Sequence, residues 1–128
     1  MLPSLHDSLV LGFAVQCDTR TIRIDFQLPE NNERVALNFS EVLAYHFEDD
    51  AFGNIVGEFE EVPASDIYIA NSKQISESFH RSGAPGPWAE TPDSALGFLR
   101  ANSARGFSLL SSIGLSCWVI AKGCSRAV

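Results

Sequence analysis

The first half of the chain alternates apolar and polar residues, a pattern typical of antiparallel strands that bury one face. The clearest example is residues 20–28, whose even-numbered positions are all apolar from Ile22 to Leu28. Similar runs over 9–15, 35–47 and 55–62 predict three more strands, and the first of these has Leu9, Leu11, Phe13 and Val15 at period two. The short turn at 17–19 joins the first two strands as a hairpin. We therefore expect a four-stranded meander.

After Pro63 the pattern changes toward that of a helix. Ser65 and Asp66 are good helix caps, and Ile75 and Phe79 lie four residues apart, so we expect a helix within 66–81. The run 67–69 is rich in β-branched and aromatic residues, which leaves open whether 66–70 is strand or helix.

The rest of the chain predicts a second helix and a closing hairpin. Thr91 is a helix cap followed by Pro92 at the first helical position, and we expect this helix to end at Gly106. Segments 107–110 and 115–121 then form two strands around a turn. The sum is an α+β fold, in which an antiparallel sheet (the N-terminal four-stranded meander plus the C-terminal hairpin) carries one or two helices on one face. The length of 128 residues supports a single domain over residues 1–128.

Charge is distributed unevenly along this domain. The chain carries 9 Lys and Arg against 16 Asp and Glu, a net charge of −7. This balance argues against a nucleic-acid partner and against an anionic membrane surface, both of which attract basic proteins. Residues 35–72 hold eight acidic side chains and no Lys or Arg, so the negative excess is concentrated in the middle of the chain.

The sequence also indicates a cytoplasmic protein. The apolar run Leu9–Val15 is far shorter than a membrane helix, and the first basic residue, Arg20, follows it instead of preceding it as a secretory signal requires. Three widely spaced cysteines, Cys17, Cys117 and Cys124, suit free thiols in a reducing compartment. Cys117 lies in a strongly apolar segment and is expected to be a core residue. The oligomeric state does not follow from these features.

Few residue patterns carry recognisable chemistry. No glycine-rich phosphate-binding motif and no metal-ligand spacing is present, so we expect neither a cofactor nor a metal site. His46 and Glu48 would share one strand face and form a possible pocket pair. Glu58 and Glu60 likewise share a face, where two exposed carboxylates on one strand are commonplace.

Three segments resemble small bacterial proteins of the polymorphic-toxin immunity type. They are Leu5-His6-Asp7-Ser8 before the first strand, the strand Arg34–Phe39, and the strand Asn54–Phe59 ahead of a helix. The resemblance covers the first two-thirds of the chain in outline. It implies a cytoplasmic, non-catalytic α+β protein that binds and blocks a cognate toxin, and it assigns no functional residue.

Three function classes follow from these features. The first is an immunity-type inhibitor that binds a basic toxin domain through an acidic surface, with the partner-binding candidates Glu48, Asp49, Asp50, Glu58, Glu60 and Trp88. The second is a small enzyme or ligand-binding domain with a pocket between sheet and helices that uses His46 and nearby carboxylates. The third is an accessory subunit that pairs through an edge strand. The acidic charge is equally compatible with a role in solubility alone.

Overall fold

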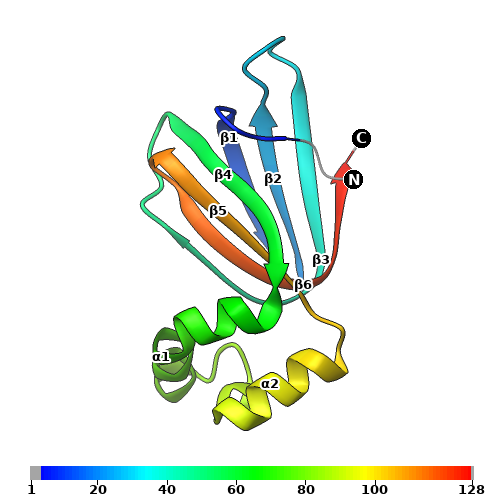
Figure 1. The fold of residues 1–128 in the computed structure, drawn as a ribbon, viewed down its shortest axis with the longest axis vertical. Coiled ribbons are helices and arrows are strands. Elements are labelled where there is room, and N and C mark those ends of the chain that lie inside the picture. Colours follow the sequence, from blue (N-terminus) through cyan, green and yellow to red (C-terminus); the bar gives the residue numbers. More distant parts are fainter. Residues whose placement is uncertain (1–3, 128) are drawn as a thin grey trace.

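The computed structural model describes residues 4–127, which fold into a β-barrel with two helices at one end (Figure 1). The strands are β1 (Leu9–Gln16), β2 (Thr21–Gln27), β3 (Arg34–Glu48), β4 (Asn54–Pro63), β5 (Arg105–Ile113) and β6 (Ser116–Ala127). The helices are α1 (Ala64–Ser82) and α2 (Pro92–Ala101), with the short 3₁₀ turn η1 (Pro87–Ala89) between them. Every predicted strand is present, and residues 66–70 are helical. The second helix ends at Ala101, earlier than the predicted Gly106, because β5 already begins at Arg105.

The strands close into an antiparallel barrel in the order β1-β2-β3-β6-β5-β4. The C-terminal hairpin lies between β3 and β4, so these two strands are not neighbours and the predicted four-stranded meander is wrong. The barrel closes between β1 and β4, where Leu9 pairs with Ile55 and Val10 pairs with Asn54. The predicted open α+β sheet with helices on one face is therefore also wrong. Alternation specifies which residues face inward but not which strands are adjacent, and closure pairs edges that an open sheet leaves exposed.

An irregularity in β3 divides the continuous wall of the barrel into two parts, which we name separately. Residues Arg34–Phe39 pair with β2 on one edge and with β6 on the other. Glu41 then adopts a positive φ of 49°, the pairing with β6 shifts register between Val42 and Ala44, and the rest of β3 keeps only β6 as a partner. We call β1, β2 and the first part of β3 the first sheet. The second sheet contains the last part of β3, the first part of β6, β5 and β4.

The barrel interior is filled by apolar side chains from both sheets. Phe39 of the first sheet meets Phe107 of the second edge to face, with ring centroids 5.1 Å apart. Ile22, Ile24 and Phe26, predicted to share the buried face of their strand, are all buried. Burial of such large side chains contributes about 1.5–3 kcal/mol each, so this interior is the main source of stability.

Bulges change two of the predicted strand faces. In β1 the register shifts between Val10 and Gly12, so that Phe13 and Val15 pair with inward-facing residues of β2 while Leu9 faces outward. In β4 the register shifts around Gly57, so that Val56 is buried in the interior although Glu58 and Glu60 are exposed. A single inserted residue reverses the face of everything that follows, which alternation alone does not reveal.

The two helices cover one end of the barrel and part of the outer side of the second sheet (Figure 1). Gly106 permits the approach of α1, because a Cβ at this position would lie 2.8 Å from Ile67 Cδ1 and 2.8 Å from the Val62 carbonyl oxygen. Helix α2 begins as predicted, with the Thr91 hydroxyl accepting a hydrogen bond from the Ser94 backbone N–H at 3.1 Å.

Candidate functional site

Two clefts lie between helix α1 and the barrel, and Trp118 of β6 lines both. A kink divides α1 between them. Asn71 has non-helical dihedral angles, and its side-chain Nδ2 donates a hydrogen bond to the Ile67 carbonyl oxygen at 2.9 Å. The first part of α1 therefore borders one cleft with Asp66 and Asn71, and the second part borders the other with Gln74 and Ser78. This kink and Trp118 together separate the two sites.

The first cleft is acidic, and the strand pairing of the second sheet brings its lining residues together. Glu60 lies opposite Ser108, and Ser108 lies opposite Trp118 on the outer face. Glu48 lies opposite Ser116 in the next row. We use the name acidic groove for the resulting cleft of about 310 Å³, which has Glu48, Glu60 and Asp66 at its rim and Ser108, Leu110 and Ser116 among its lining residues. No Lys, Arg or His belongs to the described lining.

The acidic groove brings together three carboxylates from separate elements. Asp66 lies in the first turn of α1, where the helix N-terminus favours a negative charge. Glu58 is one row further from the helices, opposite the exposed side chain of Leu110. Across residues 4–127 no group of three or more His, Cys, Asp or Glu side chains is arranged to hold a metal ion. The acidic groove therefore offers negative charge and hydrogen-bond acceptors around a small apolar centre that includes Leu110.

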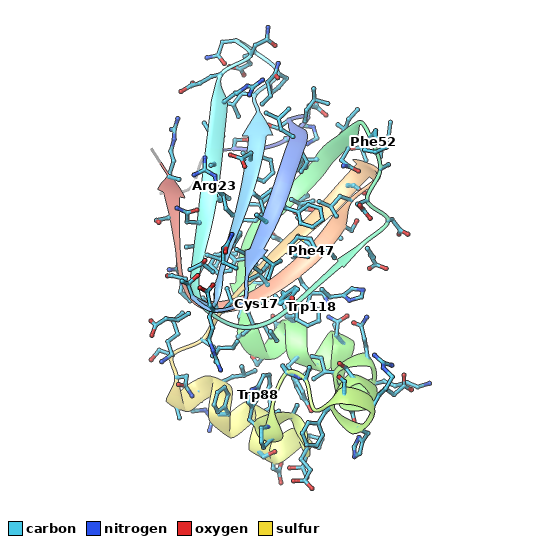
Figure 2. The ribbon with its side chains drawn as sticks, turned by 180° about the vertical axis from the view of Figure 1, so that it is seen from behind. Cys17, Arg23, Phe47, Phe52, Trp88 and Trp118 are labelled. Carbon is cyan, nitrogen blue, oxygen red and sulfur yellow. The ribbon has the colours of Figure 1, made fainter. Side chains whose placement is uncertain are left out.

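The structure distributes the predicted partner-binding residues unequally. Glu48, Glu58 and Glu60 lie on the outer face of the second sheet, and Asp49 and Asp50 follow at the exposed end of β3. Trp88 lies elsewhere, among the helices, with its ring stacked on Phe98 at a centroid distance of 4.9 Å (Figure 2). Phe52, in the β3–β4 loop, is the fully exposed aromatic residue at the opposite end of the molecule (Figure 2).

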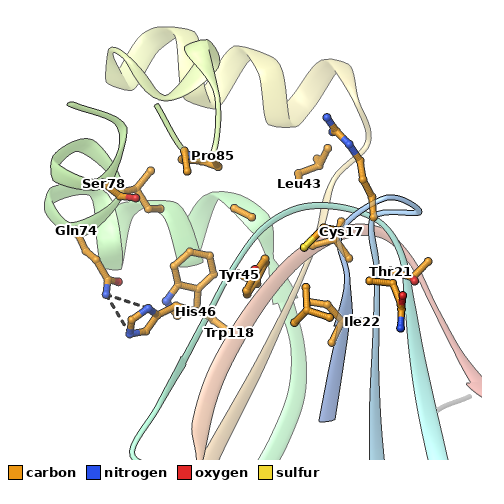
Figure 3. Close-up of a pocket in the computed structure, with 17 residues that line it drawn as sticks. Cys17, Thr21, Ile22, Leu43, Tyr45, His46, Gln74, Ser78, Pro85 and Trp118 are labelled. Carbon is orange, nitrogen blue, oxygen red and sulfur yellow. Dashed lines mark hydrogen bonds between the residues drawn. The ribbon is translucent and has the colours of Figure 1, made fainter. Parts of the chain in front are cut away.

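The second cleft lies where the end of the barrel meets α1 and the loop after it, and we call it the barrel–helix cleft (Figure 3). It measures about 430 Å³. Cys17 and Thr21 lie on its barrel side, and Gln74 and Ser78 lie on its helix side (Figure 3). The predicted pair of His46 and Glu48 is divided between the two sites, since His46 lines this cleft and Glu48 lines the acidic groove.

His46 is held in place at the edge of the barrel–helix cleft. The side-chain amide of Gln74 donates to its imidazole, with 3.1 Å between Gln74 Nε2 and His46 Nε2 (Figure 3). The ring also lies beside the indole of Trp118, with centroids 6.3 Å apart. Contacts from both α1 and β6 therefore restrict the orientation of this side chain.

The three cysteines differ in their surroundings. Cys117 is buried in the barrel interior, as predicted, and burial raises the pKa of its thiol to about 12. Partial burial likewise raises the pKa of Cys124 to about 11, against a smaller opposing effect of the Arg105 charge. A raised pKa reduces the thiolate fraction, which makes these two thiols poor nucleophiles. Cys17 is exposed at the barrel–helix cleft.

Sequence reasoning missed several residues of both clefts. Asp66 was identified only as a helix cap, and Arg20, Gln74 and Trp118 were not proposed as site residues, although all four line a cleft. These residues come from a turn, a helix and a strand that meet only in the folded chain. No local motif marks such a combination.

Comparison with known proteins adds no information about the function of either cleft. Neither a family model, nor a curated protein, nor a solved structure matches the chain. Within the part of the chain that the structure describes, no helix combines the length and the apolar character needed to cross a membrane.

Proposed function

We propose that this protein is a non-catalytic binding protein of the immunity type, which inhibits a basic toxin domain by binding it through the acidic groove. The observation that carries this proposal is the convergence of Glu48, Glu60 and Asp66 on one groove whose described lining has no basic side chain. Toxin domains that cleave nucleic acids are basic because they bind phosphates, and an acidic inhibitor competes for that surface.

The character of the groove supports a protein partner. Leu110 of β5 is 54% exposed and lies opposite Glu58 of β4. Its side chain gives this surface an apolar centre with charged side chains around it. Protein interfaces commonly combine an apolar centre with a polar rim. Because the charges are exposed, they act mainly by accelerating association, and the effect weakens as salt rises.

The test uses the protein encoded immediately upstream of this chain as the binding partner. Co-expression followed by size-exclusion chromatography and calorimetry measures whether a complex forms and with what affinity. Charge reversal by Glu48→Lys and Glu60→Lys together, both in the lining of the acidic groove, is expected to weaken that affinity at least about tenfold at low salt, and less at high salt.

The matched control carries the same change in net charge on another surface. Glu77→Lys with Glu90→Lys alters two exposed acids that line neither cleft, and this variant should keep nearly the affinity of the unmodified protein. The proposal is wrong if the upstream protein forms no complex, or if both double variants lose affinity to the same extent.

A further inference from the structure

The barrel–helix cleft differs from the rest of this acidic protein in its charge. The protein has 16 Asp and Glu residues, and none of them belongs to the described lining of this cleft. The lining includes one permanent cation, Arg20, in the turn between β1 and β2, and the imidazole of His46 of β3. No carboxylate therefore opposes an anion from within the lining of this cleft.

Arg20 is available to bind such an anion. Its side chain makes no salt bridge or hydrogen bond to any residue within 4–127, whereas Arg23, Arg105 and Arg126 each pair with a carboxylate. Its backbone is anchored, because the Arg20 carbonyl oxygen accepts a hydrogen bond from the Val42 N–H at 2.9 Å. An unpaired guanidinium on a fixed turn offers several donors to a carboxylate.

The walls of the cleft are mainly apolar. Apolar lining residues come from the barrel (Val15, Ile22 and Val42) and from the helical layer (Ile75 and Pro85), and the rings of Tyr45 and Trp118 also line the cleft. Figure 3 shows Ile22 on the barrel side and Pro85 on the helix side. The volume of about 430 Å³ is within the range of roughly 300–1,000 Å³ that is usual for small-molecule sites. Apolar walls with a few polar groups at the edge match a ligand that has an apolar body and one charged end.

We propose that the barrel–helix cleft binds a small amphipathic monocarboxylate, whose carboxylate pairs with Arg20 while its aliphatic or aromatic body lies between β3 and the second part of α1. One permanent cation matches one carboxylate, and Gln74 fixes the orientation of His46 at the opposite edge of the cleft. This site is separate from the acidic groove, so it neither requires the proposed inhibitory function nor conflicts with it.

The experiment compares ligands of the same chain length that differ only in their head group. Decanoate, decanol and decylammonium are titrated by calorimetry below their aggregation concentrations. Binding is followed in parallel by the fluorescence of Trp118 in a Trp88→Phe background, which leaves one of the two tryptophans. Decanoate is expected to bind, to change this fluorescence, and to bind at least about tenfold more tightly than decanol, because a charged hydrogen-bonded pair is stronger than a neutral one.

Two variants locate the site. Arg20→Gln should weaken decanoate about tenfold or more and leave decanol unchanged, whereas the control Arg23→Gln, which removes an arginine outside the cleft, should alter neither. Ser78→Trp places a large side chain in the cleft from the half-buried face of α1 and should block both ligands. Circular dichroism verifies that each variant is folded.

Three results overturn the proposal. The first is a wild-type protein that binds none of the three ligands. The second is a wild-type protein that binds decanol or decylammonium as tightly as decanoate. The third is an Arg20→Gln variant whose affinity for decanoate equals that of Arg23→Gln.

Discussion

The side chain of Asn54, at the start of β4, accepts a hydrogen bond from the backbone N–H of Leu115, 2.8 Å away and 61 residues later in the sequence. The same Oδ1 atom accepts from the Ala51 N–H at 2.9 Å, and Nδ2 donates to the Ala51 carbonyl oxygen at 2.6 Å. One buried amide therefore joins the β3–β4 loop to the turn between β5 and β6. It does so beside the residues that close the barrel.

Removal of this amide is expected to destabilise the fold. Asn54→Ala leaves the buried backbone N–H of Leu115 without a partner and removes two part-buried hydrogen bonds to Ala51, which should lower the free energy of unfolding by about 2–3 kcal/mol. Urea denaturation followed by circular dichroism measures the change. Asn38→Ala is the control, because Asn38 is half-buried on β3 but its side chain makes no hydrogen bond within residues 4–127, and it should cost well under about 1 kcal/mol. Equal losses in the two variants would contradict this role of Asn54.

Gly114 should be equally intolerant of substitution, for a different reason. Its φ is 84°, and a Cβ at this position would lie 2.1 Å from Asn54 Oδ1. Gly53 supplies a control, since its φ is 103° but a Cβ there would meet nothing within 4 Å. Gly53→Ala should cost about 1 kcal/mol from backbone strain alone, and Gly114→Ala about 2–4 kcal/mol from strain plus the displaced amide. The difference between their urea midpoints measures the steric part, and no difference would disprove it.

The ion pair between Glu61 and Arg105 should give stability a modest pH dependence. Arg105 donates to both carboxylate oxygens of Glu61, at 2.7 and 2.8 Å, and this pairing holds the pKa of Glu61 below its usual value of 4.5. A lowered pKa in the folded state means that the stabilisation is present above the unfolded-state pKa and is lost as the pH falls through the folded-state pKa. Glu61→Gln should therefore lower the free energy of unfolding at pH 7, and this loss should shrink as the pH is lowered from 7 toward 3.

The size of this effect is limited by solvent. The side chain of Glu61 is 42% exposed, so we expect a difference of about 0.5–1 kcal/mol at pH 7. Glu33→Gln removes a more exposed pair in which a single contact of 3.0 Å joins Glu33 to Arg126, and its effect should be smaller. Thermal denaturation of both variants across this pH range provides the measurement. A Glu61→Gln effect that grows as the pH falls would refute the assignment.

The cysteines should react in a definite order. Exposed Cys17 is expected to be alkylated first by iodoacetamide at pH 8, Cys124 more slowly, and Cys117 last. The raised pKa values of about 11 for Cys124 and about 12 for Cys117 leave little thiolate at that pH, and burial adds a steric barrier. Mass spectrometry of timed digests gives the three rates, and rapid labelling of Cys117 in the folded protein would show that its burial is incorrect. In denaturant the three rates should converge.

Local patterns in the sequence were reliable where the physical cause was local. The buried series of Ile22, Ile24 and Phe26 follows directly from alternation, and Thr91 followed by Pro92 identified the start of α2 from capping chemistry. The shared exposure of Glu58 and Glu60 was predictable for the same reason. The bulge at Gly57 was not, because an inserted residue changes the pairing without changing the composition of the strand.

The sequence by itself determined the strands, the helices and the concentration of acidic charge between residues 35 and 72. Only the tertiary structure decided that the strands close into a barrel, because strand partners are chosen by long-range pairing and by irregularities such as the one at Glu41. The same pairing placed Glu48 and Glu60 on one groove and separated His46 from Glu48. Both clefts are formed by segments that are far apart in the chain and that meet at Trp118. Local sequence patterns do not predict such long-range contacts.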